Sequence, residues 1–349
     1  MLLESLGWNC WFEENFETHA RAGLVPGRVL TEANEIYRVA SSQGEVWAEL
    51  SGGLRYRAAG REDLPAVGDW LALQSVPPPS RSIVRAVLPR RTRIARKAAG
   101  EREELQLIAA NVDTVWIVSS ANRDWNPRRI ERYLTVVRDG GAEPVVVLSK
   151  VDLAEDLAPY VAEAEAVAGG AAVLTASGKT GEGVAALERF LAPGRTVALL
   201  GSSGVGKSTL VNRLLGEDRQ AVREIRASDD RGRQATTRRE LFAVPAGGLL
   251  LDTPGMRELA LMTDAAAVEE VFDDVEALAE RCRFRDCQHQ GEPGCAVAGA
   301  VAGGELAAER LESYQKLQRE ESFRSDRDRF GANYAEKKRW HAFHKKLQK

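Results

Sequence analysis

Cysteine, histidine and methionine are scarce in this chain of 349 residues, and long apolar segments are missing. Three of the 4 cysteines crowd between positions 282 and 295 beside a histidine, a spacing more typical of a metal site in a reducing compartment than of a disulfide framework. No apolar run approaches the roughly 20 residues that cross a bilayer, and the N-terminus lacks the basic start and apolar stretch of a secretory signal. We therefore expect a cytoplasmic protein with no membrane partner, and we expect it to be monomeric.

An excess of charge of one sign is also missing. The net charge of -3 and the pI near 6.0 argue against a general polyanion binder, although both values average over unlike regions. Residues 85–97 hold six basic side chains and no acid, and residues 319–349 hold ten Lys/Arg against five Asp/Glu. The hydrophobic content of 44% is that of a globular protein, and the length allows about two or three compact domains.

The first part of the chain contains six short runs with strand character, punctuated by Gly and Pro. These runs are residues 24–30, 35–40, 45–50, 54–58, 69–74 and 83–88. They predict a small all-β barrel that is compatible with an OB-fold, a frequent oligonucleotide-binding scaffold. Another kind of small β-barrel is the alternative.

From Asn111 the pattern changes to alternating strands and helices, which predicts a doubly wound, mainly parallel sheet. The expected strands are residues 112–118, 144–148, 172–174, 197–200 and 249–251, and the expected helices are 127–138, 156–168, 184–191 and 207–215. A hairpin between residues 241–244 and 249–251 should add one antiparallel edge strand. Beyond Gly255 we expect helices at 264–278 and 305–321. The predicted domains are therefore residues 1–100, 101–262 and 263–349.

A phosphate-binding loop follows the strand that ends at Leu200, because the next residues fit G-x-x-x-x-G-K-S. Glycines let backbone N–H groups close around phosphates, Lys207 supplies a cation to the β and γ oxygens, and Ser208 offers a hydroxyl to Mg2+. The predicted phosphate-site residues are Gly201, Ser202, Ser203, Gly204, Val205, Gly206, Lys207, Ser208 and Thr209.

A guanine-reading motif precedes this loop. The carboxylate of Asp152 can accept hydrogen bonds from guanine N1–H and the 2-amino group, whereas adenine would leave it unpaired, which disfavours an ATPase or kinase. Lys150 can lay its methylene stem over the base, and the N–H of Gly178 can meet O6. Ser149 replaces the asparagine that usually ties this loop to the phosphate loop, which predicts weaker affinity. The predicted base-site residues are Ser149, Lys150, Val151, Asp152, Ser177, Gly178 and Lys179.

The order of the motifs indicates a circular permutation, since ordinary small GTPases carry the phosphate loop first and the base motif last. The segment Asp252-Thr253-Pro254-Gly255 is the third nucleotide-sensing element. Asp252 should reach Mg2+ through a water, and the N–H of Gly255 should sense the γ-phosphate. Because this element leads straight into the C-terminal region, the switch should act on that region.

The polar segment between Gly216 and Arg239 is the expected first switch, in which Thr236 or Thr237 binds Mg2+. The residue after Gly255 is Met256, and a thioether cannot orient a water molecule. Hydrolysis should therefore be slow until another group is supplied. Our hypothesis is that Gln234 provides this group; the alternative is an exposed glutamine without a role.

The cysteine cluster has the pattern Cys282-x4-Cys287-x-His289-x5-Cys295. Three thiolates and one imidazole suit tetrahedral Zn2+ with no open position, so the predicted site is structural and not catalytic. Unligated cysteines beside a surface histidine are the alternative.

Taken together, these residues resemble the ribosome small-subunit-dependent GTPase family, known as RsgA or YjeQ. The resemblance covers residues 66–70, residues 109–113, the permuted motifs and residues 282–295. It implies an N-terminal OB-fold, a circularly permuted GTPase domain with GTP or GDP and Mg2+, and a C-terminal zinc domain. It further implies late maturation of the small (30S) ribosomal subunit, with GTP hydrolysis stimulated by the subunit and coupled to release. Family members commonly carry His and Thr at the positions of Gln234 and Ala235.

The resemblance also suggests a use for the two basic stretches. Residues 85–97 and the tail around Arg339, Trp340 and His341 are expected to contact rRNA through phosphate contacts and stacking. A plain solvated face is the alternative for each stretch. A rival function from another class is a nucleotide-gated RNA-binding module whose turnover is incidental.

Overall fold

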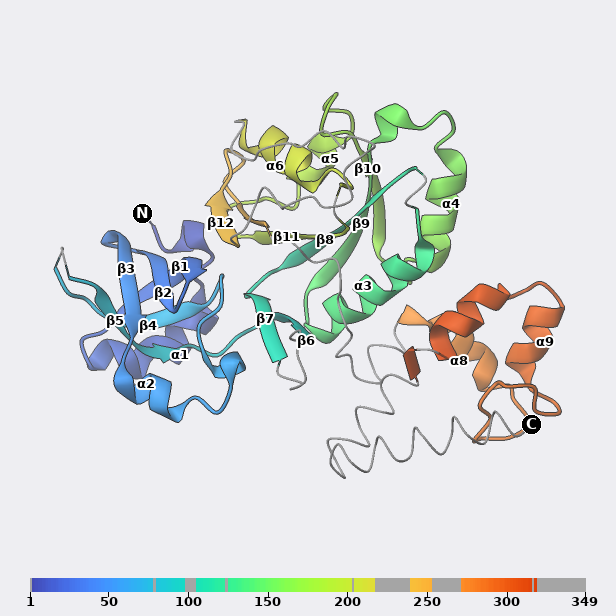
Figure 1. The fold of residues 1–349 in the computed structure, drawn as a ribbon, viewed down its shortest axis with the longest axis horizontal. Helices are drawn as coiled ribbons and strands as arrows, with labels where there is room; N and C mark the ends of the chain where they lie inside the picture. The colour runs from blue at the N-terminus through green and yellow to red at the C-terminus, as the bar shows by residue number, and fades with distance from the viewer. Residues whose placement is uncertain are drawn as a thin grey trace. The chain divides into compact units, whose positions relative to one another are not determined.

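The computed structural model in Figure 1 describes residues 2–77, 80–97, 105–122, 125–202, 204–216, 239–252, 271–315 and 317–318. The predicted site residues Ser203, Gln234, Thr236, Thr237 and Gly255 lie outside these ranges. The chain forms two compact units, Met1–Ala260 and Leu261–Lys349. Among the described residues, no helix combines the length and the apolar character that crossing a membrane requires.

A closed β-barrel opens the N-terminal unit, as predicted. Its strands are β1 (Val25–Ala33), β2 (Ile36–Ser41), β3 (Gly44–Leu50), β4 (Trp70–Gln74) and β5 (Ser82–Val87). The strands pair in the order β1-β2-β3-β5-β4, and β4 returns to β1, which closes the barrel. One short 3-10 helix (Glu4–Leu6) precedes the barrel, and another (Arg61–Asp63) precedes β4.

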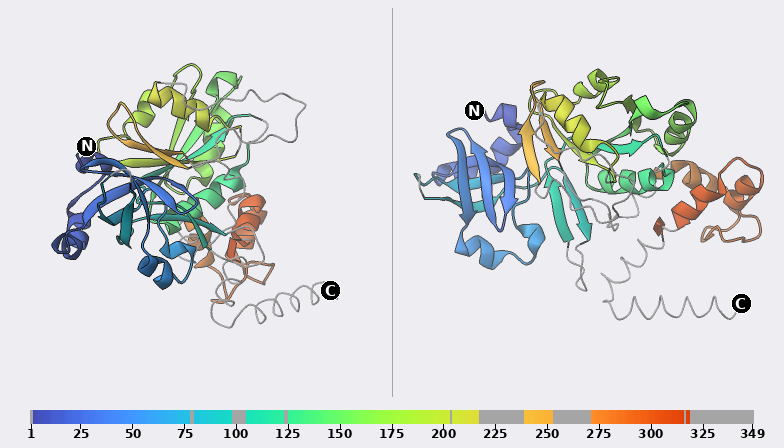
Figure 2. Two further views of the ribbon diagram at one scale, coloured as in Figure 1. Left: turned by 60° about the vertical axis from the view of Figure 1, so that its left-hand side comes forward. Right: turned by 45° about the horizontal axis from the view of Figure 1, so that its top comes forward.

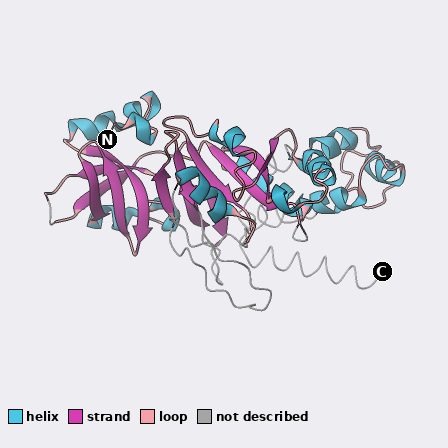
Figure 3. Ribbon diagram, turned by 90° about the horizontal axis from the view of Figure 1, so that it is seen from above, coloured by secondary structure: helices cyan, strands magenta, loops and turns pink. Residues whose placement is uncertain are grey.

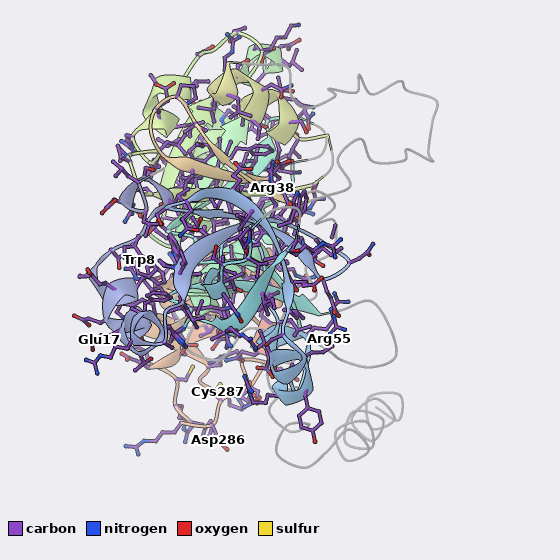
Figure 4. All side chains as sticks on the ribbon, turned by 90° about the vertical axis from the view of Figure 1, so that its left-hand side faces the viewer. Trp8, Glu17, Arg38, Arg55, Asp286 and Cys287 are labelled. Atoms are coloured by element: carbon purple, nitrogen blue, oxygen red, sulfur yellow. The ribbon has the colours of Figure 1, made fainter. Side chains whose placement is uncertain are left out.

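Two helices in this region differ from the sequence expectation. The predicted strand at residues 54–58 is wrong, because this segment belongs to helix α2 (Gly52–Arg57). The side chain of Ser51 caps it by accepting a hydrogen bond from Leu54 N at 3.2 Å, and this local bond stabilises the helical turn over an extended chain. Helix α1 (Cys10–Arg21) was not predicted; it packs on the barrel through aromatic contacts around Trp8, labelled in Figure 4, whose ring lies 4.7 Å from that of Trp70.

The rest of the N-terminal unit is built on a mainly parallel sheet, as predicted. Its strands are β8 (Thr114–Ser120), β9 (Glu143–Ser149), β10 (Ala172–Ala176), β11 (Thr196–Leu200), β12 (Glu240–Ala243) and β13 (Leu249–Asp252). Their order is β10-β9-β8-β11-β13-β12, with only β12 antiparallel to its neighbour β13. The strand β11 thus lies inside the sheet although it follows β8, β9 and β10 in the chain.

In the described part of this region, four α-helices and one short 3-10 helix (Val151–Leu153) accompany the sheet, and Figure 3 shows helices and strands in separate colours. The α-helices are α3 (Pro127–Asp139), α4 (Ala158–Val167), α5 (Val184–Glu188) and α6 (Lys207–Leu215). A buried apolar cluster joins α5 and α6 to the sheet and includes Leu187, Leu210, Val118 and Leu199. This cluster fixes the end of β11, where the phosphate loop begins, relative to α6.

The predicted edge strand β12 is not an edge. It pairs with β1 of the barrel, with Thr31 opposite Glu240, so that the sheet and the barrel form one 11-stranded arrangement. Both views in Figure 2 show the orange strand next to the blue barrel strands. The expectation of an edge was wrong because a local pattern does not reveal a partner strand from elsewhere in the chain. The pairing covers backbone groups that an edge would leave open.

A two-stranded sheet of β6 (Arg93–Lys97) and β7 (Leu105–Ala110) connects the barrel to the larger sheet. The side chain of Asn111 fastens this connection, because its Oδ1 accepts from Arg91 N at 2.9 Å and its Nδ2 donates to Gly68 O at 3.2 Å. The strands β6 and β7 pair across the predicted domain boundary at residue 100.

The described part of the C-terminal unit contains helices, as predicted, together with a non-helical loop at residues 280–295. It contains α8 (Asp273–Ala279), α9 (Ala296–Ala302) and a helical segment over residues 308–315. The ring of Phe272 lies 5.5 Å from that of Tyr314, and Arg310 makes an ion pair with Asp274 at 2.5 Å. These contacts join α8 to the last helical segment.

Candidate nucleotide-binding site and metal centre

The predicted phosphate loop joins the buried strand β11 to helix α6. A side chain at Gly201, whose φ is +149°, would place its Cβ 2.2 Å from the carbonyl oxygen of Val118, so only glycine fits. Gly206 precedes α6 in a left-handed conformation with φ +97°. The ammonium of Lys207 donates to the carbonyl oxygens of Gly201 and Ser202, each at 2.7 Å. The loop therefore encloses a cation beside a helix N-terminus, an arrangement suited to phosphate.

A second cation, which no sequence motif predicted, lies at this loop. Arg129, in the first turn of α3, donates a hydrogen bond from Nη1 to the hydroxyl of Ser202. Its helix follows β8, the strand beside β11, so both α3 and the phosphate loop start at the carboxyl edge of the sheet. The sequence shows only that Arg129 begins a helix after a strand, and no motif marks such a position.

The end of β9 brings the base motif against the phosphate loop. Ser149 is 1% exposed, and its hydroxyl donates to the carbonyl oxygen of Val205 and lies 3.2 Å from that of Ser119. The short serine thus ties the two loops together, which the sequence analysis attributed to the usual asparagine. Lys150 adopts a left-handed conformation with φ +59°. Its stem runs beside Gly206, because a Cβ placed there would lie 3.7 Å from Lys150 Cγ.

The carboxylate of Asp152 is oriented by the second base loop. Ser177, which is fully buried, donates from its hydroxyl to Asp152 Oδ1 at 2.6 Å. Arg213 on α6 holds the same loop, donating from Nε to Gly178 O at 3.1 Å and from Nη2 to Lys179 O. The structure thus brings residues 149–152 and 177–179 together. Arg213 had no signal in the sequence, because it binds through backbone carbonyls.

Asp252 ends β13 and is 3% exposed. Its Cα partner on β11 is Leu199, which lies two residues before the phosphate loop. The hydroxyl of Ser208 stands in the first turn of α6. Mg2+ prefers oxygen ligands of this kind, a carboxylate and a hydroxyl, so the donor set fits the ion.

The four predicted metal ligands lie close together in the C-terminal unit, where Figure 4 labels Cys287. The ligand atoms of the predicted residues Cys282, Cys287, His289 and Cys295 all lie within 4.8 Å of one another. His289 Nδ1 is 3.5 Å from Cys295 Sγ and 3.7 Å from Cys282 Sγ, and the two sulfurs are 3.9 Å apart. Tetrahedral zinc with Zn–S bonds of about 2.3 Å needs ligand atoms about 3.8 Å apart. The four donors therefore fit a closed zinc site.

The loop between the ligands is held by a carboxylate that the sequence analysis missed. Glu292 accepts from Gln288 N at 3.0 Å and from Gln290 N at 2.7 Å, and its Oε2 lies 3.7 Å from Cys287 Sγ. Backbone hydrogen bonds lower the pKa of Glu292. Partial burial and the thiols of Cys295 and Cys282 raise the pKa of Cys287 to about 12. A metal cation is what would hold all three sulfurs as thiolates.

The basic stretch at residues 85–97 is partly used inside the protein. Arg90 is bidentate with Asp69, at 2.8 Å for both bonds, and also donates to the carbonyl oxygens of Glu62 and Leu64. Arg85 donates to the side chain of Gln74. The charge of Arg90 is therefore neutralised within the barrel. The basic tail at residues 319–349 lies outside the described part of the chain.

Comparison with known proteins agrees with this geometry. Residues 87–262 match the family described as RsgA GTPase. A protein of Opitutus terrae named small ribosomal subunit biogenesis GTPase RsgA is 47% identical over 349 residues, covering 97% of this chain and 95% of the relative. A protein of the same name from Syntrophotalea carbinolica is 42% identical over 347 residues, with coverage of 97% and 95%.

Two solved structures have a similar fold. The crystal structure of YjeQ from Thermotoga maritima matches with a TM-score of 0.62 and 27% identity, covering 85% of this chain and 98% of that chain. The structure of YloQ, described as a circularly permuted GTPase, matches with a TM-score of 0.60 and 23% identity, covering 86% of this chain and 96% of that chain. At this identity the match supports a similar fold and nothing about function. With the phosphate loop downstream of the base motif on one sheet edge, the chain belongs to the RsgA GTPase family.

Proposed function

We propose that this protein is a GTP hydrolase that acts in the biogenesis of the small ribosomal subunit. The observation that carries the proposal is the Asp152 carboxylate, oriented by Ser177 toward the same sheet edge as a phosphate loop closed around Lys207. This juxtaposition supports the reading of a guanine base and its phosphates together. The small ribosomal subunit is inferred as the partner from the names of the relatives, whose sequences align over nearly the whole chain.

The predicted site residues would divide the binding work by chemistry. The backbone of residues 201–209 and the ammonium of Lys207 would surround the phosphates, while Asp152 and Gly178 would read the base. Ser208 and, through a water, Asp252 would hold Mg2+, which supplies positive charge to the β and γ oxygens when bound. Either Thr236 or Thr237 as a further Mg2+ ligand, Gly255 as the γ-phosphate sensor and Gln234 as the water-orienting group stay predictions.

The remaining parts of the proposal concern the partner. The barrel would act as an OB-fold on rRNA, and the C-terminal unit would carry one structural Zn2+ through Cys282, Cys287, His289 and Cys295. Subunit binding would stimulate hydrolysis during late maturation, and hydrolysis would allow release. A protein that acts on the small ribosomal subunit can be a cytoplasmic monomer, and both properties stay predictions.

The decisive experiment measures GTP hydrolysis with and without purified 30S particles. We expect slow turnover alone and a large increase with the particles; equal rates would contradict the proposal. Comparing release from the particles with GTP and with a nonhydrolysable analogue separates this function from an RNA-binding module with incidental turnover. Equal release in both conditions would favour the latter.

A second experiment tests the base site. In Asp152→Asn the amide oxygen can still accept from N1–H, but the amide nitrogen faces the 2-amino donor of guanine, whereas it can donate to the 2-oxo group of xanthine. GTP affinity should therefore fall by about 100-fold while XTP binding appears. Isothermal titration with GTP, XTP and ATP makes the comparison. Retained GTP preference in the variant, or ATP preference in the wild type, would remove guanine from the proposal.

A further inference from the structure

One residue of β12 joins the barrel to the nucleotide site. Glu240 is paired with Thr31 of β1 on one side and with Asp252 of β13 on the other. Asp252 is the carboxylate that would hold Mg2+ through a water. A single strand position therefore lies between a barrel strand and a metal-binding residue, with no other strand intervening.

A side-chain contact reinforces this backbone connection. Arg38 on β2, the strand partner of Thr31, forms an ion pair with the carboxylate of Glu240. The two side chains are 30% and 33% exposed, so the pair is half-buried and less screened by salt than a surface pair. Arg38 also lies 3.7 Å from Glu45 on β3. Figure 4 labels Arg38 where the barrel strands meet the orange strand.

The residue before Glu240 is anchored as well. Arg239 donates from Nη1 to the carbonyl oxygen of Leu107 on β7 at 3.0 Å. The start of β12 is thus held by β1, β2 and β7, which all lie outside the parallel sheet that carries the nucleotide site. Displacement of the barrel would act on this short strand first, because β12 has only four residues.

We propose that the Arg38–Glu240 ion pair couples the barrel to the nucleotide site. A partner that binds the barrel would shift β2 and β12 together, and the Glu240–Asp252 pairing would carry the shift to the Mg2+ ligand. Arg38 and Glu240 are then positioning residues, since neither touches the nucleotide. This proposal rests on the proposed function, because the partner it invokes is the small ribosomal subunit.

The barrel offers a matched control pair. Arg81 and Glu49 form an ion pair at 3.1 Å on β3 and its neighbouring segment, with side chains 46% and 52% exposed. In the part of the chain that the structure describes, β3 pairs with β2 and β5 and not with β12. Breaking it changes the charge of the barrel by the same amount as breaking Arg38–Glu240, without acting on Glu240.

The experiment compares Arg38→Glu, Glu240→Arg, the double swap and Arg81→Glu in the full-length protein. Three quantities are measured: GTP hydrolysis alone, hydrolysis with 30S particles, and binding to 30S particles with a nonhydrolysable GTP analogue. Each single swap should lower the stimulation by about tenfold, a typical size for coupling between sites, while hydrolysis alone and binding stay within about twofold. The double swap should restore most of the stimulation, and Arg81→Glu should leave it unchanged.

Several results would overturn the coupling. Full stimulation in Arg38→Glu, an equal loss in Arg81→Glu, or a loss of binding that matches the loss of stimulation would each assign the effect elsewhere. The milder Arg38→Gln replaces Arg38→Glu if thermal melting shows that the reversed charge unfolds the protein. A wild-type protein that 30S particles do not stimulate would remove the proposed function itself, whereas a stimulated wild type with an unaffected Arg38→Gln removes only the coupling.

Discussion

The candidate nucleotide site and the candidate metal centre are built in opposite ways. The nucleotide site draws on segments between Ser149 and Asp252, which four parallel strands bring to one edge of the sheet. The metal centre takes all its ligands from residues 282–295. Hydrogen bonds such as Ser177 to Asp152 and Lys207 to Gly201 already hold the first site in shape. The second site gathers three thiols whose mutual repulsion as thiolates only a cation offsets, so its order should depend on the ion.

The largest expected effect is the loss of the metal. Chelation, or Cys282→Ser, should unfold the C-terminal unit, because a structural zinc site contributes about 10 kcal/mol or more and this unit has a small apolar core. The nucleotide site should be unaffected, with GDP affinity within about twofold of the wild type. Limited proteolysis, zinc content and a GDP titration on the same samples make the comparison. A C-terminal unit that stays protease-resistant without metal would contradict it.

Removal of the Lys207 ammonium should have the next largest effect, on the rate of GTP hydrolysis. In Lys207→Ala the rate of GTP hydrolysis should fall by about 1,000-fold, because the charge on the transferred phosphate loses its nearest partner. Zinc content and thermal stability should stay close to those of the wild type. Arg189→Ala, at an exposed position just beyond α5, is the matched control and should retain its activity. A comparable loss in the control would point to general charge instead.

A smaller effect is expected from the carboxylate that holds the metal loop. In Glu292→Gln one acceptor becomes an amide donor, which opposes the backbone N–H groups of Gln288 and Gln290. Zinc affinity should fall by about tenfold, the low end for groups that orient metal ligands. Competition with a chromogenic chelator measures it, and Glu305→Gln, at an exposed position in the same unit, should behave as wild type. Unchanged zinc affinity would show that the loop is ordered by its ligands alone.

The smallest predicted effect tests how firmly the nucleotide site is pre-formed. Ser149→Ala removes the hydroxyl that ties the base loop to Val205. The loss of one buried hydrogen bond costs about 1 kcal/mol, so guanine nucleotide affinity should fall by about fivefold. Titration with GDP at several temperatures provides the measurement. A loss of more than about 100-fold would mean that the site depends on this tie and is not pre-formed by the sheet.

The same contrast explains what the sequence could predict. The metal ligands and the phosphate loop could be predicted because each set of residues lies within a short stretch of sequence with a recognisable spacing. Arg129, Arg213 and Glu292 were missed, since each acts through hydrogen bonds that need no fixed spacing from a motif. The expectation of a strand at residues 54–58 came from alternating apolar residues over a stretch too short to distinguish it from a capped helical turn.

The strand pairings show the same limit at long range. The parallel order of the central sheet was predictable, because alternating strands and helices allow few arrangements. The pairing of Thr31 with Glu240 joins positions more than 200 residues apart, and neither local pattern refers to the other. The role of the barrel as a neighbour of β12 therefore had to come from the structure.

The pairing of β12 with the barrel has a practical consequence for expressing the GTPase region without the barrel. A truncated fragment starting near residue 101 would lose β1 and expose the open ladder of β12, along with an unneutralised Glu240. The exposed edge of β12 in such a fragment can pair with a strand of a second copy. Low solubility or domain-swapped dimers should therefore accompany the deletion. Capping that strand with a grafted β-hairpin would be the remedy.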